Sequence, residues 1–247
     1  MRMRENWDIY LISQIHRAGG LSESGDPTKC VLSTYPPDYQ LPNHIPFDNR
    51  PTYLVPSHFD PRDQVIRQKS RKLCRPRKKP LPNPLWAAGF SFSFCDVFLK
   101  NEIFPPHPSL THHLFFGEEI YIGLKLFLNG IECFCPPETV LFHMYDRSHR
   151  PSYFSLVDRP LEDQTSSLTL LLDLIGSKDD QEISSSSDGR TVQEWLEKVG
   201  VESWEEGRLI SGFEFGGLGS DEFADEFTST VLSLINFSQQ TLDEKKS

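Results

Sequence analysis

The stretch from residue 114 to 142 constrains the fold of this chain more than any other. Apolar residues recur there at three- and four-residue spacing over 121–128, which predicts a helix. An Asn-Gly pair at 129–130 should end it, because glycine is the usual residue just past a helix. Residues 131–135 and 139–142 then read as strands, separated by a Pro-Pro turn. A helix followed at once by strands predicts a mixed α/β fold.

Ionisable side chains lie at both ends of this stretch. Glu118 and Glu119 follow Gly117 where the helix should begin, and His143 and Tyr145 follow the second strand. Both places are typical of active sites on an α/β scaffold. Two glutamates at a helix start are, however, commonest as partners of the helix dipole, and a histidine at a strand end is more often hydrogen-bonded than metal-bound. The residue pattern alone leaves both roles open.

A family resemblance adds to this pattern. The sequence Leu-Phe-Phe-Gly-Glu-Glu-Ile at 114–120, together with Gly130, Pro-Pro-Glu at 136–138, His143 and Ser-His-Arg-Pro at 148–151, resembles the cytoplasmic hydroxyproline type of N-acetylglucosaminyltransferase. The resemblance covers most of the first 200 or so residues. It implies a GT-A nucleotide-sugar fold and transfer of N-acetylglucosamine, with retention, from UDP-GlcNAc to a protein hydroxyl. In the best-known case that hydroxyl is a hydroxyproline on a ubiquitin-ligase adaptor.

The resemblance also implies roles for individual residues. Glu118 and Glu119 stand where such enzymes place acidic residues that contact the donor sugar or the acceptor, and Glu119 is the better candidate for the chemistry. His143 stands where a histidine completes the metal site, so the implied cofactor is a divalent cation, Mn or Mg. The residues expected to contact substrate are Trp86, Gly89, Phe116, Gly117, Tyr145, Arg147 and His149.

The beginning of the chain resembles the family segment that directly follows an Asp-x-Asp motif, which holds the metal and the donor diphosphate. The sequence has no such motif at the end of a predicted strand. We therefore expect the C-terminal half of a GT-A-like fold, whose donor-binding half is missing and whose cation binds only with that half. Two functions follow from this expectation. One is a glycosyltransferase whose donor-binding half is missing only from this sequence. The other is a truncated, non-catalytic domain that acts as a binding module.

A third hypothesis is an unrelated metal hydrolase. Its ligands would be His112, His113, Glu118 and His143. Adjacent histidines on one loop rarely bind the same ion, so this hypothesis ranks last. Cys133 and Cys135 should point to the same side of a strand, but a single pair makes a poor zinc site. Buried structural cysteines are the better interpretation.

The N-terminal part should contain one helix and few strands. An amphipathic pattern predicts a helix over 5–18, and 31–35 reads as a short strand that ends at two prolines. The proline-rich residues 36–62 should form loop. The basic run 67–79 could face phosphate or act as a localisation signal, although a solvated, mobile loop is favoured. Alternating phenylalanines over 86–94 predict a strand with one buried aromatic face.

Two domains are expected, a partial GT-A-like domain over 1–160 and a helical C-terminal appendage over 161–247 with a serine-rich linker. Residues 167–175 should form an apolar helix, and 225–236 an amphipathic one. A capping box, Thr-x-x-Glu at 191–194, should open a further helix that Gly200 closes.

Composition limits the partners and the compartment. A net charge of −10 argues against a nucleic-acid partner. Five cysteines without regular spacing favour a reducing compartment, and no apolar run approaches the ~20 residues that span a bilayer. The expected partners are UDP-GlcNAc and a protein acceptor, without nucleic acid and without a membrane segment in this chain. The expected location is the cytoplasm, or the Golgi if an N-terminal anchor is missing.

Overall fold

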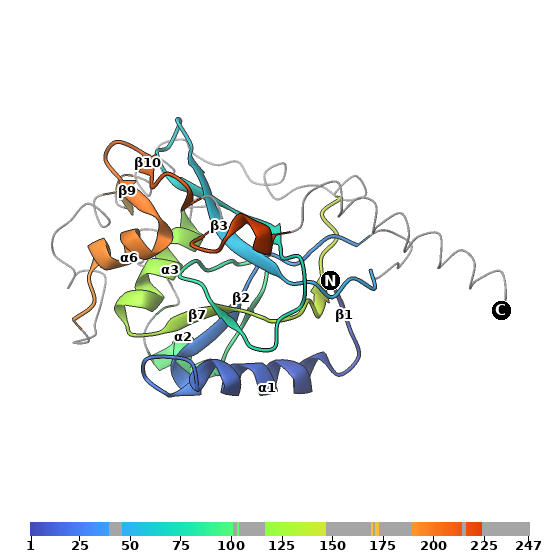
Figure 1. Ribbon diagram of the computed structural model, residues 1–247. Helices are drawn as coiled ribbons and strands as arrows, with labels where there is room; N and C mark the ends of the chain where they lie inside the picture. The colour runs from blue at the N-terminus through green and yellow to red at the C-terminus, as the bar shows by residue number, and fades with distance from the viewer. Residues whose placement is uncertain are drawn as a thin grey trace, which may run out of the picture.

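A four-stranded mixed sheet forms the centre of the molecule, in the order β5-β7-β2-β6 (Figure 1). The strands are β5 (Leu81–Pro82), β7 (Glu132–Cys135), β2 (Cys30–Ser33) and β6 (Ser91–Phe92). β2 and β7 pair in parallel, and the other two pairs are antiparallel. This computed structural model describes residues 1–39, 46–100, 103, 117–146, 169, 171–172, 189–213 and 216–223.

Two helices cover the two faces of this sheet, α1 (Trp7–Gly19) below it and α3 (Glu118–Leu128) above it in Figure 1. Successive residues of a strand point to opposite faces. Accordingly Leu32 of β2 packs with the buried residues of α1, whereas the adjacent Val31 packs with those of α3. The central strands are therefore apolar on both sides, as buried strands between two helical layers should be.

The sequence predicted both helices correctly. α1 buries Leu11, Ile15 and Ala18, and it ends at the expected glycine pair. α3 begins after Gly117, whose φ of 107° lies in the left-handed region, and it ends at Asn129. That φ favours glycine strongly over a residue with a side chain.

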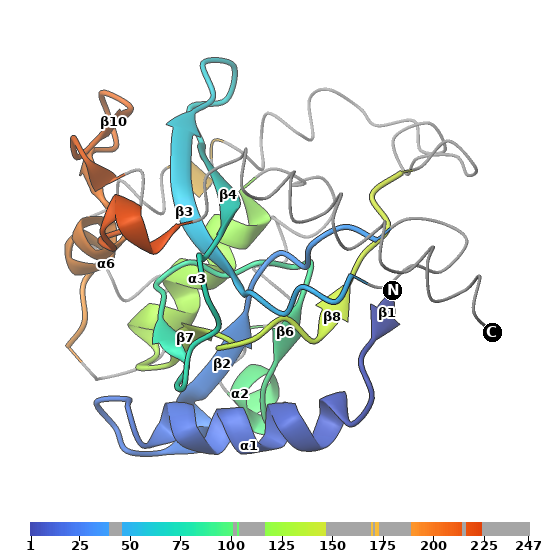
Figure 2. The same ribbon diagram turned by 45° about the vertical axis from the view of Figure 1, so that its right-hand side comes forward.

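The remaining described strands form three two-stranded sheets. β3 (Thr52–Phe59) pairs with β4 (Ile66–Lys72), β1 (Arg2–Met3) with β8 (Leu141–Phe142), and β9 (Val201–Ser203) with β10 (Arg208–Leu209). Figure 2 shows the β3–β4 hairpin rising from the sheet on the α3 side. The short helices are η1 (Pro27–Lys29), α2 (Cys95–Lys100) and η4 (Ser220–Glu222).

The hairpin corrects two predictions. The loop expected over 36–62 is wrong for β3, because its first residues are buried and Pro56 lies where the strand register shifts. Proline is tolerated at such a bulge. The mobile loop expected over 67–79 is wrong for β4, in which acidic partners offset part of the basic charge.

The aromatic strand expected over 86–94 is much shorter than predicted. β6 contains only two residues, and the short helix α2 begins at Cys95. Phe90 and Phe92 pack against the residues buried by α1, but Phe94 is 37% exposed. The expected buried cysteines are confirmed, since Cys133 and Cys135 are both buried as free thiols.

Helix α6 (Val192–Val199) forms where the capping box predicted it. Both halves of the box are present, and Gly200 ends the helix with a φ of 88°. Trp195 of α6 is fully buried in the same apolar cluster as α3, and its Nε1 donates to the carbonyl of Pro84 at 3.1 Å.

Several predictions concern residues outside the described ranges. The domain boundary at residue 160, the serine-rich linker and the helix over 225–236 are among them. Within the predicted helix 167–175, residues 169, 171 and 172 are described, and they are helical. Among the described residues, no helix has the length and apolar character needed to cross a membrane. A mixed α/β fold is thus confirmed, and its division into domains and its GT-A character stay predictions.

Candidate functional site

The Glu119 carboxylate ties four segments together at the end of β2. It lies in the first turn of α3, where its Oε2 accepts a hydrogen bond from the Tyr35 hydroxyl, two residues past β2. The same oxygen accepts from Nε2 of Gln68 on β4 at 3.1 Å. Its Oε1 accepts from the backbone N–H of Ala88 at 2.7 Å. Both carboxylate oxygens of Glu119 therefore accept hydrogen bonds from other parts of the chain.

Gln68 links the β3–β4 hairpin to this network. Its Nε2 donates to the carbonyl of Trp86 at 2.7 Å and lies 3.1 Å from the Tyr35 hydroxyl oxygen. Trp86 itself is buried, and its Nε1 donates to Ser91 Oγ at 3.0 Å. Trp86 thus reaches the network through its backbone, while its indole ring anchors the loop.

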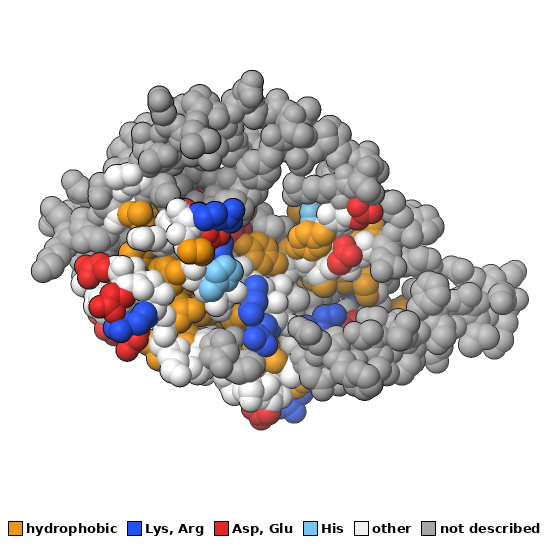
Figure 3. Space-filling model, turned by 90° about the horizontal axis from the view of Figure 1, so that it is seen from above, with side chains coloured by type: hydrophobic (Ala, Val, Ile, Leu, Met, Phe, Trp, Pro, Cys, Tyr) orange, Lys and Arg blue, Asp and Glu red, His pale blue; other side chains and the backbone are white. Residues whose placement is uncertain are grey.

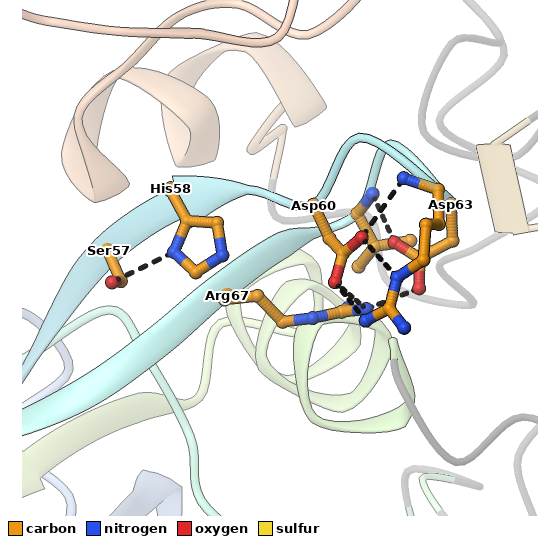
Figure 4. Close-up of polar contacts among 7 residues, drawn as sticks. Ser57, His58, Asp60, Asp63 and Arg67 are labelled. Atoms are coloured by element: carbon orange, nitrogen blue, oxygen red, sulfur yellow. Dashed lines mark hydrogen bonds and ion pairs between the residues drawn. The ribbon is translucent and has the colours of Figure 1, made fainter.

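The turn of the hairpin is fixed by carboxylates and arginines (Figure 4). Asp60 accepts from the backbone N–H and the guanidinium of Arg62, at 3.0 and 2.8 Å, and from Arg67 at 3.2 Å. Asp63 accepts from Arg67 and, at 3.0 Å, from the N–H of Val65. These bonds define the turn, and β4 thereby presents Gln68, the residue after Arg67, to Glu119.

The loop over residues 86–90 crosses the end of β2 at very short range. The Ala87 N–H donates to Ser33 Oγ at 2.9 Å, and that hydroxyl donates to the Phe90 carbonyl at 3.0 Å. A Cβ on Gly89 would lie 3.1 Å from Tyr35 Cδ1 and 3.2 Å from Pro36 Cδ. Glycine at position 89 therefore allows the loop to approach Tyr35 closely.

His143 follows β8 and pairs with the segment that leaves β2. It forms an isolated parallel bridge with Asp38, and its N–H donates to the Pro37 carbonyl at 3.0 Å. The Tyr145 ring meets the imidazole edge-on at a centroid distance of 4.6 Å. Tyr145 also donates from its N–H to Asp38 Oδ1 at 3.2 Å and from its hydroxyl to the Pro36 carbonyl at 2.8 Å.

The segment 35–39 therefore joins the glutamate end of the site to the histidine end. Tyr35 contacts Glu119, and the next three residues contact His143 and Tyr145. Burial raises the pKa of Tyr145, and the charges of Asp38 and Glu119 add to that rise. In open α/β sheets, ligands bind in the crevice beyond the carboxyl ends of the parallel strands, and this cluster lies at that end of β2.

Burial also shifts the pKa values of the two glutamates at the start of α3. It raises the pKa of Glu119, although the bonds from Tyr35, Ala88 and Gln68 oppose the shift. It raises the pKa of Glu118, and the neighbouring charge of Glu119 adds to the rise. Burial, followed by the Glu119 charge, raises the pKa of Tyr35, so its hydroxyl stays protonated and donates.

Rising pH should lower the free energy of unfolding just above the ordinary carboxyl pKa of about 4.3. In that range the folded protein keeps protons on Glu118 and Glu119 that the unfolded chain has lost. The folded state then binds more protons, so its stability falls as pH rises. Asp48 has the opposite effect at lower pH. Burial opposes the shift, but hydrogen bonds from Arg50 and Lys72 lower its pKa, so its contribution to stability grows as pH rises.

Urea unfolding at several pH values between about 4.5 and 7 measures this slope. Glu118→Gln removes one of the two groups, so its slope should be shallower than that of the wild type. Glu197→Gln, on the exposed side of α6, serves as the control and should keep the wild-type slope. Identical slopes in all three proteins would contradict the prediction.

The structure brings five of the predicted site residues to this end of β2 and leaves others outside its described part. Glu119, Trp86, Gly89, Tyr145 and His143 meet here, and Glu118 and Gly117 adjoin Glu119 at the start of α3. Phe116, Arg147 and His149 lie outside the described residues, as do His112 and His113. Their roles, like those of the other site residues, stay predictions.

Three residues of the cluster were missed in the sequence. Tyr35 could have been found, because it ends a predicted strand immediately before two prolines. Asp38 follows the same turn, but nothing in the local pattern pairs it with His143. Gln68 gave no signal, since it is a neutral residue within a basic run.

A metal would find two candidate ligands in this cluster. Directly paired strand residues point to the same face, so the Asp38 carboxylate and the His143 imidazole emerge together. Within the described ranges, no group of three or more His, Cys, Asp or Glu side chains is placed to hold an ion. The divalent cation implied by the resemblance therefore stays a prediction.

The face seen from above in Figure 3 is the one toward which the hairpin rises. Lys and Arg side chains lie across the middle of its described part, and acidic side chains lie nearer its edges. β4 contributes Arg67, Lys69 and Arg71 at alternate positions, so these three share one side of the strand. Gln68, which reaches Glu119, points to the other side of β4, and Arg67 is ion-paired with Asp60 and Asp63.

Comparison with known protein families places the chain in a described family. The family described as Glycosyltransferase (GlcNAc) matches residues 1–204 of the 247-residue chain, which include all the predicted site residues. No curated protein and no solved structure matches the chain.

Proposed function

Because the chain belongs to the GlcNAc glycosyltransferase family, we propose that it transfers N-acetylglucosamine from UDP-GlcNAc to a protein hydroxyl. Hydroxyproline is the acceptor proposed first, and the cluster at the end of β2 is the proposed site. The observation that carries the assignment to this cluster is the Glu119 carboxylate, which joins α3, β4, the 86–90 loop and the end of β2.

Glu119 has two tasks in this proposal. It orients the Ala88 N–H and the Tyr35 hydroxyl, so the loop beside the reacting sugar is fixed before substrate binds. Its negative charge is also proposed to stabilise the positive charge that develops on a sugar during transfer. Glu118, half-buried beside it, is proposed to contact the donor sugar or the acceptor hydroxyl.

The other end of the cluster is proposed to hold the donor diphosphate. His143 and Asp38 would bind a divalent cation, Mn or Mg, which neutralises charge on the leaving diphosphate. Tyr145 covers the imidazole edge-on and orients it. Arg147 is proposed to contact the diphosphate, because a guanidinium matches phosphate geometry.

Transfer to a peptide tests this function directly. A form of the protein that includes the expected donor-binding half is incubated with UDP-GlcNAc, MnCl₂ and a peptide that contains hydroxyproline. Mass spectrometry then measures the addition of one N-acetylhexosamine. We expect addition to this peptide and none to the matched proline peptide. His143→Ala should abolish the transfer while circular dichroism stays unchanged, whereas Lys100→Ala, on exposed α2, should transfer normally. Wild-type rates in His143→Ala would refute its role as a ligand.

Binding of an acceptor without turnover is the second candidate function. It is favoured by the small number of ligands, since the described part of the cluster offers an ion only Asp38 and His143. Under this alternative the hydroxyproline peptide binds, but no sugar is added and UDP-GlcNAc does not change the affinity. Transfer together with tighter binding in the presence of UDP-GlcNAc would support the enzyme instead.

A further inference from the structure

A cavity lies on the opposite side of the sheet from Glu119. Its volume is about 640 Å³, and it opens between α1 and two loops, at residues 77–79 and 137–138. α1 covers the sheet face to which Leu32 points, whereas Glu119 belongs to the helix on the other face. The cavity therefore has no contact with the site proposed above, although its volume is typical of a small-molecule site.

Basic side chains dominate the wall of this cavity. Arg17 comes from α1, and Arg77, Lys78 and Lys79 come from the end of the basic run. Glu138 is the only acidic residue among those that line it, and its Oε2 accepts from Asn49 Nδ2 at 3.0 Å. Arg77 forms an ion pair with Glu222. Arg17 and the two lysines outnumber the single carboxylate of Glu138, so the wall keeps a net positive charge, which attracts an anion.

The wall also contains a buried acceptor that needs a donor. Gln14 is only 3% exposed, and it lies with Tyr10 and Arg17 on the face of α1 that lines the cavity. Its Nε2 donates to Ser13 Oγ at 3.2 Å. The Ser13 hydroxyl proton is directed to the Tyr10 carbonyl at 2.7 Å, so Ser13 must accept from Gln14. Because the atom bonded to Ser13 is the amide nitrogen, the other terminal atom of the Gln14 side chain is the carbonyl oxygen, Oε1.

Gln14 Oε1 makes no hydrogen bond with any of the described residues. The Nε of Arg77 likewise has no acceptor in the described part of the chain. A buried polar atom left without a partner is costly, and a bound ligand would remove that cost. Gln14 lines the cavity, and χ3 is soft in glutamine, so its terminal amide can turn when a ligand binds.

We propose that this cavity binds a small phosphate ester that carries hydroxyl groups, such as a phosphorylated sugar. Arg17, Lys78 and Lys79 bind the phosphate, and Gln14 Oε1 accepts from a hydroxyl group of the ligand. An anion alone would leave Gln14 without a donor, and a neutral sugar would leave the positive charges without a partner. Phosphate and hydroxyl groups on one molecule satisfy both.

Isothermal titration calorimetry of the full chain tests the proposal with glucose 6-phosphate, glucose and inorganic phosphate. Glucose 6-phosphate should bind with a dissociation constant below about 1 mM, and each of the other two should bind at least about tenfold more weakly. Arg17→Met, which keeps an apolar side chain at this position, should weaken the binding of glucose 6-phosphate by about tenfold or more. The matched control is Lys100→Met, which removes one positive charge outside the cavity and should leave the affinity unchanged.

Gln14→Leu separates the two parts of the site. It should weaken glucose 6-phosphate several-fold and leave the affinity for inorganic phosphate unchanged, because the phosphate group does not contact residue 14. Circular dichroism and thermal melting establish that each variant is folded. Failure of the wild type to bind glucose 6-phosphate, or equal affinity in the wild type and Arg17→Met, would overturn the proposal. Equal binding of glucose 6-phosphate and inorganic phosphate would also overturn it.

Discussion

Glu119→Ala is expected to lower kcat/KM for GlcNAc transfer by about 100-fold or more. The truncation removes the acceptor for the Tyr35 hydroxyl, for Gln68 Nε2 and for the Ala88 N–H at once. The 86–90 loop then loses its link to α3, and the negative charge proposed to face the sugar disappears. Rates measured with UDP-GlcNAc and the hydroxyproline peptide give the ratio directly.

Two further variants separate charge from position. Glu119→Gln keeps an oxygen for the Ala88 N–H but removes the charge, so a large loss in kcat with little change in thermal melting would identify an electrostatic role. Tyr35→Phe removes one hydrogen-bond donor and keeps the charge of Glu119, so it should lower kcat/KM only about tenfold. A Glu119→Ala protein that is folded and as active as the wild type would exclude Glu119 from the reaction.

Trp195→Ala is expected to reduce the free energy of unfolding by about 3–5 kcal/mol. The side chain is fully buried between α6 and α3, and its Nε1 donates to the carbonyl of Pro84. Gly123 of α3 lies close beneath it, since a Cβ there would be 3.6 Å from Trp195 Cζ2. Removal of the indole would therefore leave a cavity at the contact between the two helices. Equilibrium unfolding in urea measures the change.

Trp195→Phe serves as the matched variant. It retains an aromatic ring but loses the hydrogen bond to Pro84, so it should reduce the free energy of unfolding distinctly less than the alanine substitution does. A loss below about 1 kcal/mol for Trp195→Ala would mean that α6 adds little to the stability of the central core. A large loss would show instead that a helix beyond residue 160 is needed for the stability of the sheet.

Local sequence signals predicted the three longest helices of the described region, but not the short helix α2. α1, α3 and α6 each combine an apolar stripe with a glycine at or near the end, and α6 adds its capping box. Such signals depend on neighbours in sequence, and one sequence is enough to read them. The same holds for β2, whose apolar residues end before two prolines.

The hairpin and the site network could not be predicted in this way. β4 looked like a solvated loop, because its acidic partners Asp48 and Asp60 lie elsewhere in the sequence. Gln68 reaches Glu119 across 51 positions, and Tyr35 does so across 84. Tertiary packing decides such contacts, and it overrides local preference in strands especially often. His143 and Glu119 were singled out because both flank a readable helix–strand unit.

The parallel pairing of β2 with β7 also has a consequence for biosynthesis. The two strands are about one hundred residues apart in the chain, so the central sheet cannot close until β7 has left the ribosome. At roughly 5–20 residues per second, the edge of β2 that pairs with β7 stays open for several seconds, even after β6 can pair with the other edge. We therefore expect nascent chains halted before residue 132 to be rapidly cleaved by protease and to require chaperones, and chains extended past α6 to resist cleavage.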